Sequence, residues 1–477
     1  MGILERLKEN CIIILFAISI FFSHVVLYGV SVRFAYLASL VFIFFNYRNY
    51  IKRNLVKIII SGIFIFSFFC YSFYHWAVFN ALDVFDYSSL IFFLDNTKTV
   101  YKLLTIFLTI VIILDCNQIL INNFEKIINF FLAIFTLAMS MYIIQNYNLF
   151  YDIMTNCTTG FFSITNFIYK ENSHFSIVSV PLIYYFFLNI NSYLNKYYYL
   201  PFWILFIIFS IYSASSTFYV GFFLTGCGVL ICSRNIEKKI IAIILIASAL
   251  VTSIFFLKET CISKEPDLES VKLIKSDPFK GSLLSAKAKI WDEAILKKLF
   301  PTQVPKNFSY QHLTPQEAIA VKKDPYYNLS VAIAYNSFDI AKETISKNFL
   351  GLGMDNYKIA FKIASNSKDL QGKDYDNSPY FLMLNAKGKY NNEDGSLVFS
   401  KGVVEFGILF LAFVIFLIGV AFSTKIKNPE KYFLLSLLFI QIFIRGSGYF
   451  YNGFLICSLM ITLYYLKSYD KKNIQIP

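Results

Sequence analysis

The sequence predicts an all-α integral membrane protein with about 12 transmembrane helices and one large outer, helical loop domain. Hydrophobic residues make up 57% of its 477 residues and charged residues only 15%, whereas soluble domains carry about 25% charged residues. Continuously apolar windows of about 20 residues recur, which is the length a helix needs to cross a bilayer. Residues 258–400 are polar instead, with 20 Lys, 17 Asp plus Glu and no Arg. A single soluble insertion late in a multi-span chain explains this pattern.

The apolar windows divide the chain into predicted spans. The first window follows a short charged start, is too long for the core of a signal peptide and lacks a small-residue cleavage site, so we interpret it as a retained anchor. Residues 197–233 are split into two spans at the small polar cluster from Ser213 to Ser216. The predicted spans lie near residues 10–30, 32–47, 55–79, 99–116, 127–147, 173–192, 198–213, 216–233, 239–257, 402–424, 430–446 and 448–466.

Basic residues fall in alternate loops between these spans, whereas the opposite loops are short or acidic, as at Asp83 and Asp86. By the positive-inside rule, both termini are then cytoplasmic and residues 258–400 face the outside. This distribution accounts for the net charge of +13 without a nucleic-acid partner. The basic loop residues are Arg48, Lys52, Arg53, Lys57, Lys126, Lys196, Arg234, Lys238, Lys239, Lys425, Lys427 and Lys431.

We therefore expect three parts: residues 1–257 with spans one to nine, the outer loop domain 258–400, and residues 401–477 with the last three spans and a cytoplasmic tail. Inside the loop, Thr314-Pro-Gln-Glu317 has the pattern of a capping box with proline at the first helical position. It predicts a helix from Pro315 to about Lys323. A second helix is expected over 331–348, ending before Gly351.

Two of the six arginines, Arg33 and Arg445, lie at the predicted outer ends of spans, against the positive-inside rule. A guanidinium in that place is costly unless it lines a wet cavity or meets a fixed partner, and its planar fork suits a phosphate. Each could instead extend to the lipid headgroups. The occurrence of two such arginines, with polar neighbours on the same face, favours an anionic ligand.

Polar side chains gather on this outer face. Glu171 and His174 open the sixth span and are candidates for acid–base chemistry, with a helix-end carboxylate and an interfacial histidine as the plainer alternatives. Glu405 lies about one turn inside the tenth span, where an acidic residue indicates a site. The remaining candidates on this face are Lys170, Ser216, Asp355 and Tyr449, while His24 and His75 are expected to be packed inside spans.

Motifs for nucleotide, metal and serine-hydrolase chemistry are absent from the sequence: it has no Walker motif, no HExxH pair and no GxSxG elbow. Gly351-Leu-Gly353 lacks the preceding strand and third glycine of a dinucleotide site. The eight cysteines show no metal-ligand spacing. Cys157 and Cys261 fall in two outer loops, where a disulfide between them stays open. We expect neither a metal nor another cofactor.

Several stretches resemble the O-antigen ligase and polymerase superfamily of bacterial envelopes. The first is the polar opening Glu171-Asn-Ser-His174 of a middle span. The second is a helix leading into Gly351-Leu-Gly353-Met-Asp355-Asn-Tyr357, and the third is Glu405-Phe-Gly407 where a span starts after an Asn-rich loop end. The large outer loop before the last spans matches the topology of that family. The resemblance covers roughly the second two-thirds of the chain.

The resemblance implies a metal-independent glycosyltransferase in the bacterial inner membrane. An acceptor sugar hydroxyl would attack a glycan carried on undecaprenyl pyrophosphate, with Arg33 and Arg445 holding the pyrophosphate, helped by Lys170 or Tyr449. Glu171 or His174 would accept the proton, and Glu405 and Asp355 would orient groups. Many members carry arginine in the small-residue turn, where this chain has serines such as Ser216. The resemblance implies the lipid bilayer and the lipid-linked oligosaccharide as partners and leaves a chain-length regulator open.

Four functions stay open at this point, and one of them is a structural or receptor role that only the large loop favours. Ligases of the family tend to have a histidine just before the Glu-x-Gly motif, where this chain has Asn391, Asn392 and Asp394. This favours an O-antigen or capsule polymerase over a ligase that transfers glycan to the lipid A core. A non-enzymatic flippase for lipid-linked oligosaccharides is the alternative of another class. A carrier is expected to show two similar halves, and none is evident here.

Overall fold

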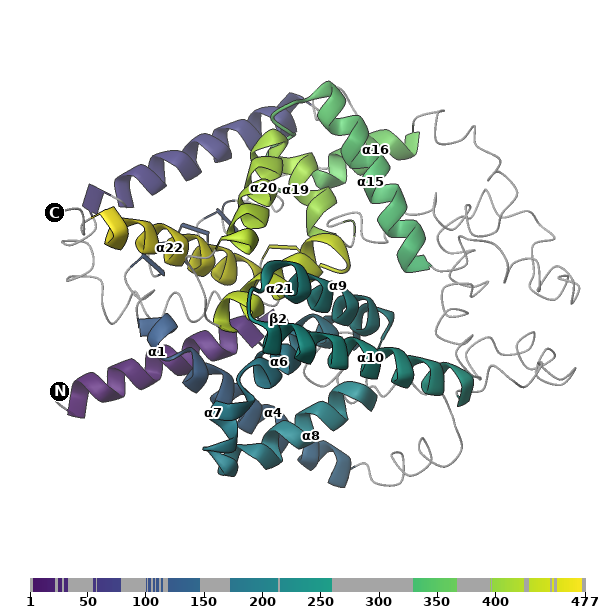
Figure 1. Ribbon diagram of the computed structural model, residues 1–477. Coiled ribbons are helices and arrows are strands. Elements are labelled where there is room, and N and C mark those ends of the chain that lie inside the picture. Colours follow the sequence, from purple (N-terminus) through teal and green to yellow (C-terminus); the bar gives the residue numbers. More distant parts are fainter. Residues whose placement is uncertain are drawn as a thin grey trace, which may run out of the picture.

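The computed structural model is mostly helical in the part that it describes, which comprises residues 3–21, 25–27, 30–32, 55–56, 58–78, scattered positions from 100 to 114, 119–145, 172–212, 215–259, 329–366, 395, 397–423, 429–446, 448–449 and 453–473 (Figure 1). The helices are α1 (Ile3–Phe21), the helix Ile58–Val78, α4 (Phe124–Gln145), α6 (Asn172–Leu188), α7 (Ile190–Leu194), α8 (Leu200–Tyr212), α9 (Ser216–Cys232), α10 (Ile236–Glu259), α15 (Leu329–Lys347), α16 (Tyr357–Asn366), α19 (Val398–Phe406), α20 (Ile408–Phe422), α21 (Pro429–Phe443) and α22 (Phe454–Asn473).

A short hairpin interrupts the first predicted span. Strand β1 (Val25–Leu27) pairs antiparallel with β2 (Val30–Val32), with Val25 opposite Val32. The prediction of one helix over residues 10–30 was therefore wrong in its second half, because α1 ends at Phe21. β-branched residues on both sides of a two-residue connection favour a hairpin over a helix.

Most other described helices lie where the apolar windows predict them. The window at 127–147 corresponds to α4, and the predicted split at Ser213 to Ser216 is confirmed because α8 ends at Tyr212 and α9 begins at Ser216. In the loop that is predicted to face the outside, the predicted helix 331–348 is confirmed as α15. The other predicted loop helix, from Pro315, lies outside the described residues.

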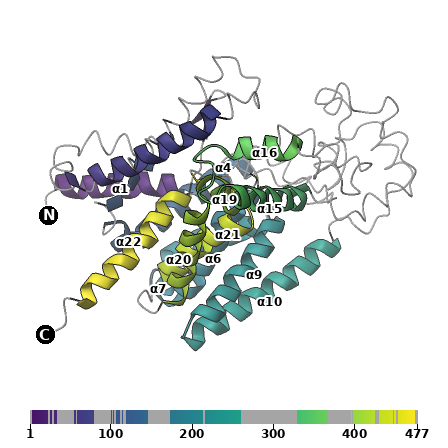
Figure 2. The ribbon, with the colours of Figure 1, turned by 90° about the horizontal axis from the view of Figure 1, so that it is seen from above.

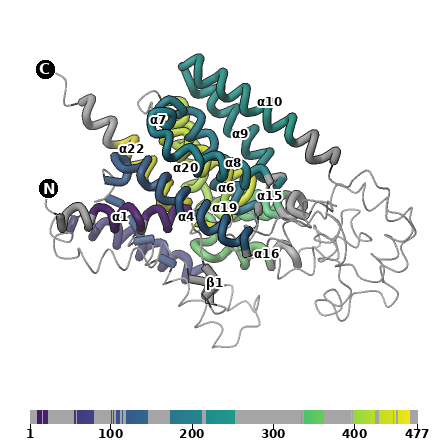
Figure 3. The backbone as a smooth tube through the Cα atoms, turned by 90° about the horizontal axis from the view of Figure 1, so that it is seen from below, coloured from purple at the N-terminus to yellow at the C-terminus, as the bar shows by residue number. Residues whose placement is uncertain are grey.

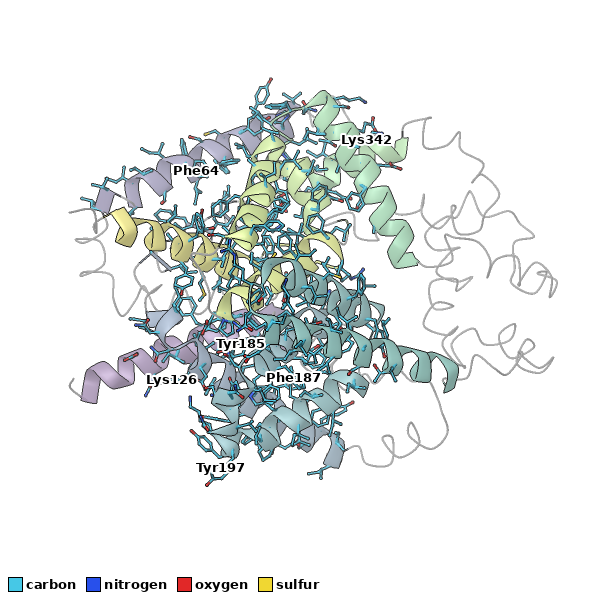
Figure 4. All side chains as sticks on the ribbon, viewed as in Figure 1. Phe64, Lys126, Tyr185, Phe187, Tyr197 and Lys342 are labelled. Atoms are coloured by element: carbon cyan, nitrogen blue, oxygen red, sulfur yellow. The ribbon has the colours of Figure 1, made fainter. Side chains whose placement is uncertain are left out.

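Two of the described helices, Ile58–Val78 and Phe124–Ile144, are long and apolar enough to cross a membrane. Large apolar side chains project from them into the surroundings: Phe64 is 59% exposed and Ile144 75% exposed, and Figure 4 shows Phe64 at the edge of the molecule. Exposed apolar surface of this extent is unusual in a soluble monomer. The helical body is therefore membrane-associated, while the number of spans stays a prediction.

The predicted span 402–424 is broken into two helices. Gly407 separates α19 from α20 with φ 53° and ψ −130°, a conformation that glycine adopts and other residues avoid. A Cβ at this position would lie 2.1 Å from the carbonyl oxygen of Phe349. The expectation of one continuous helix was wrong because the segment that follows α15 packs directly on this glycine.

The centre of the helical body is α6, against which α9 and α21 pack. Aromatic rings fill the space between α4, α6 and α8: Phe135 stacks on Phe175 with ring centroids 4.9 Å apart, and Phe206 meets both rings edge-on. Figures 2 and 3 show the same helices grouped together from above and from below. This close packing gives the body a rigid core on which the ends of the helices are held.

Different elements lie at the two ends of this helical body. α1 begins and α22 ends on the left of Figure 1, whereas α15 and α16 lie at the upper right. Figure 4 shows Lys126 and Tyr197 toward the lower left, away from Lys342 on α15. We call these the terminal end and the loop end. The loop end is where α15, α16 and the start of α19 meet.

Candidate functional site

The Gly351-Leu-Gly353 turn at the loop end is clamped between two parts of the molecule. On one side lies the helix Ile58–Val78: the Tyr71 hydroxyl donates to the Gly351 carbonyl at 2.8 Å, and the Met354 N–H donates to Ser72 Oγ at 2.7 Å. Gly351 and Gly353 have φ of 79° and 86°. A Cβ on Gly353 would lie 2.5 Å from Ser72, so only glycine allows this approach.

On its other side, the turn caps the broken helix. The Leu352 N–H donates to the Val404 carbonyl at 2.8 Å and the Gly353 N–H to the Glu405 carbonyl at 2.9 Å. Those carbonyls belong to the last turn of α19, which has no intrahelical partners for them. The Ile408 N–H, orphaned at the start of α20, donates to the Phe349 carbonyl at 3.0 Å. The turn thus satisfies the backbone groups that the break exposes.

Glu405 lies next to this break and is fully buried. Lys401, one helical turn earlier, places its Nζ 3.3 Å from Glu405 Oε1, and its own side chain is 8% exposed. No hydrogen bond of good geometry reaches either carboxylate oxygen of Glu405 from another described residue, although the Asp355 backbone and the Tyr449 hydroxyl lie close to it. Buried charges are costly unless they are paired and hydrogen-bonded, so this carboxylate is under-satisfied.

Tyr449 lies on one side of the Lys401–Glu405 pair. Lys401 Nζ lies 5.8 Å from the centroid of the Tyr449 ring, and the Phe406 ring lies 5.6 Å from it. The Tyr449 hydroxyl is buried beside Glu405, without a hydrogen bond of good geometry within the described parts of the chain. A buried carboxylate and a buried hydroxyl thus lie next to each other and to a lysine, which is a suitable environment for a ligand hydroxyl.

Asp355 adds a second acidic group in the turn. It has φ of 68°, in the left-handed region that aspartate tolerates better than most residues, and it forms an ion pair with Lys102. Burial alone would raise the pKa of Asp355, but Lys102 and Lys401 outweigh that effect and the pKa is lowered to about 2. Asp355 is therefore ionised at neutral pH.

The structure brings together three of the predicted site residues: Glu405, Asp355 and Tyr449 interact electrostatically. Sequence reasoning missed Lys102 and Lys401. The spacing of Lys401 and Glu405, four residues apart on one helix, was a signal that could have found the first. Lys102 is 253 residues from Asp355 along the chain, and nothing local in the sequence points to that contact.

Arg445 follows α21 in a turn whose Gly446 packs on Val398, because a Cβ there would lie 2.6 Å from Val398 Cγ2. Val398 and Glu405 are seven residues apart on α19, which is about 10 Å along a helix axis. The turn leads on to Tyr449, which does reach Glu405. The predicted partner, Arg33, lies outside the described residues, so the arginine pair stays a prediction.

The candidates on the sixth and eighth spans lie at the starts of α6 and α9. His174 is buried in the first turn of α6. Ser176 of α6 and Ser215, the residue before α9, have their hydroxyl oxygens 2.9 Å apart. The backbone of Ser216 starts α9. Other sequence candidates lie outside the described residues, namely Lys170, Glu171, His24, Cys157 and Cys261.

His75, expected to be packed within a span, lies on the helix Ile58–Val78 with its ring centroid 4.6 Å from that of Tyr71. Among the side chains that the structure describes, no group of three His, Cys, Asp or Glu could hold a metal ion. The titratable groups that the structure describes at the loop end include Glu405, Asp355, Tyr449 and the neighbouring lysines. Comparison with known proteins adds no name to this site: no family model, no curated protein and no solved structure matches the chain.

Proposed function

We propose that this protein is a polysaccharide polymerase that joins O-antigen or capsule repeat units carried on undecaprenyl pyrophosphate. The acceptor hydroxyl of one lipid-linked unit attacks the anomeric carbon of a second unit. A new glycosidic C–O bond forms, the bond from that carbon to the diphosphate oxygen breaks, and the diphosphate leaves with the bonding electrons. The hydroxyl proton passes to a carboxylate base. Positioning and charge stabilisation supply most of the rate in such a transfer.

One observation carries this proposal: Glu405 is fully buried at a helix break, and neither of its oxygens has a hydrogen bond of good geometry from another described residue. A sugar hydroxyl would supply a well-placed donor to this carboxylate. Lys401 puts a positive charge 3.3 Å from Glu405 Oε1, and a carboxylate acting on a hydroxyl proton is a general base. The Tyr449 hydroxyl, which lies beside Glu405, provides a second hydrogen-bonding group for the sugar. We therefore assign the base role to Glu405, while Glu171 and His174 stay as alternatives.

The proposal places the site on the outer side of the bacterial inner membrane, with both termini cytoplasmic and residues 258–400 periplasmic. Contacts at the terminal end support this arrangement, because loops predicted to be cytoplasmic meet there. Lys196 lies 2.7 Å from Glu125, and Lys238 lies over the Tyr432 ring at 5.6 Å. Undecaprenyl-linked units are expected to reach the site from the bilayer, and a chain-length regulator is an additional candidate partner.

The test replaces Glu405 by Gln in cells that depend on this protein for surface glycan. We expect the surface glycan to shorten to one repeat unit on the core, and Arg445→Ala and Glu171→Gln test the remaining predicted residues in the same assay. Lys196→Gln, at the terminal end, is the matched control and is expected to leave chain length unchanged. Wild-type chain length in Glu405→Gln would contradict the assignment of Glu405 as the base, and wild-type chain length in all three variants would remove these residues from the site. Loss of all core-attached glycan, with long lipid-linked chains accumulating, would indicate a ligase instead.

A second function, the transport of lipid-linked oligosaccharides, is favoured by one observation. Transporters commonly use interrupted helices whose half-helix ends face a binding site, and α19 and α20 are interrupted at Gly407 beside the buried Glu405–Lys401 pair. A transporter moves its substrate without changing it. Purified protein that moves a labelled lipid-linked unit across a vesicle bilayer and forms no longer glycan would support transport and exclude the polymerase.

A further inference from the structure

Three lysines from distant parts of the chain surround Asp355. Lys102 forms an ion pair with it, and Lys401 and Lys358 both act on its charge. Lys102 comes from the predicted fourth span, Lys358 from α16 and Lys401 from α19. The side chains of Lys102 and Lys401 are only 18% and 8% exposed. These lysines bring several ammonium groups, two of them largely buried, close to one another around Asp355.

In the described part of the chain, this group comprises three lysines, Lys102, Lys358 and Lys401, and two carboxylates, Asp355 and Glu405. Lys401 lies 3.3 Å from Glu405, and neither oxygen of Glu405 has a hydrogen bond of good geometry from a described residue, which is a loose arrangement for a purely structural ion pair. A multiply charged anion would find two buried ammonium groups there, each held by one carboxylate.

We propose that Lys102 and Lys401 bind the diphosphate group of the lipid-linked donor. When no diphosphate is bound, these lysines form ion pairs with Asp355 and Glu405. This inference rests on the proposed function. It differs from the sequence prediction, in which Arg33 and Arg445 bind the diphosphate. Lysine binds phosphate as a compact point charge. When diphosphate takes the lysines, Glu405 is released toward the acceptor hydroxyl, so that binding of the donor prepares the base.

The test measures binding of inorganic pyrophosphate to purified full-length protein in lipid nanodiscs by calorimetry. Lys102→Gln is expected to weaken binding about tenfold, as expected for the loss of a charge-assisted contact. Asp355→Asn is expected to strengthen binding, because it removes a competing negative charge and leaves Lys102 in place. Lys196→Gln, which removes a lysine at the terminal end, is the control and should bind as wild type does.

Lys401 is tested without leaving Glu405 buried and unpaired. The double variant Lys401→Gln with Glu405→Gln is compared with Glu405→Gln alone, so that both proteins lack the carboxylate and differ only in the lysine. We expect the double variant to bind pyrophosphate about tenfold more weakly than the single variant. Glu405→Gln alone should bind at least as tightly as wild type and still fail to polymerise.

Two further ligands identify the source of the anion. A prenyl diphosphate should bind more tightly than inorganic pyrophosphate if the site takes a lipid headgroup, and inorganic phosphate should bind more weakly than both. Equal binding of pyrophosphate by wild type, Lys102→Gln and Asp355→Asn would overturn the inference even if Glu405→Gln abolished polymerisation. Conversely, lysine-dependent binding of pyrophosphate with normal polymerisation in Glu405→Gln would uphold the anion site and reject Glu405 as the base.

Discussion

The terminal end and the loop end each contain a lysine–glutamate pair, and the two pairs differ in their surroundings. Lys196 and Glu125 are 2.7 Å apart with side chains 40% and 32% exposed, whereas Lys401 and Glu405 are 3.3 Å apart with side chains 8% and 0% exposed. An exposed pair contributes little to stability and costs little. A buried pair that is loosely arranged costs more than it returns, so the loop-end pair is better explained by function than by folding.

Burial alone does not mark a functional lysine, as Lys431 shows. It is almost fully buried, yet its Nζ donates to the Ser423 carbonyl at 2.5 Å. Ser423 follows the last residue of α20, where a cation is favoured by the helix dipole and by the orphaned carbonyls. The difference from Lys401 lies in the partners: Lys431 caps a helix end, whereas Lys401 faces a carboxylate that has no hydrogen bond of good geometry from a described residue.

The largest expected effect is at the helix break. Gly407→Ala puts a Cβ 2.1 Å from the Phe349 carbonyl oxygen at a φ of 53°, and we expect a loss of unfolding free energy on the order of 3 kcal/mol or more. Gly419→Ala on α20 is the matched control, because nothing lies within 4 Å of its Cβ, and it is expected to be neutral or slightly stabilising. Thermal unfolding in detergent measures both. Equal melting temperatures for the two variants would mean that the turn does not pack on Gly407.

A smaller effect is expected from the titration of Asp355. Its folded-state pKa of about 2 lies below the ordinary 3.8, so its ionised form stabilises the fold by about 2 kcal/mol at neutral pH. This contribution is present above about pH 4 and is lost as the pH falls toward 2. The stability difference between wild type and Asp355→Asn should therefore shrink over that range. A difference that is independent of pH would show that the Lys102–Asp355 ion pair does not hold the loop end together.

The smallest effect belongs to the terminal end. Lys196→Gln breaks a solvent-exposed pair, and we expect a loss of about 0.2–1 kcal/mol that decreases further at high salt. Lys401→Gln, which leaves Glu405 buried without its cation, should cost about 3–5 kcal/mol. Thermal unfolding of both variants at low and high salt makes the comparison. Similar losses at the two ends would remove the contrast on which the functional assignment depends.

The sequence predicted local features well and long-range ones poorly. The ends of α8 and α9 follow from the small polar residues between them, and α15 follows from its helical periodicity. The β1–β2 hairpin was missed because the mostly apolar sequence from Val25 to Val32 is compatible with either a helix or a hairpin. The break at Gly407 was missed because its cause is the Phe349 carbonyl, which packs on it from another segment. For the same reason Glu405 and Asp355 could be proposed singly, whereas their contacts with Lys102 and Tyr449 required the fold.

The most direct test of the central claim is single-turnover transfer by purified protein in nanodiscs with lipid-linked repeat units, comparing wild type with Glu405→Gln and Lys196→Gln. If the buried Glu405 carboxylate is the base, Glu405→Gln should slow glycan transfer by about 100-fold or more while the folded protein still binds pyrophosphate. Lys196→Gln should transfer at the wild-type rate. Transfer by Glu405→Gln at the wild-type rate would contradict the account.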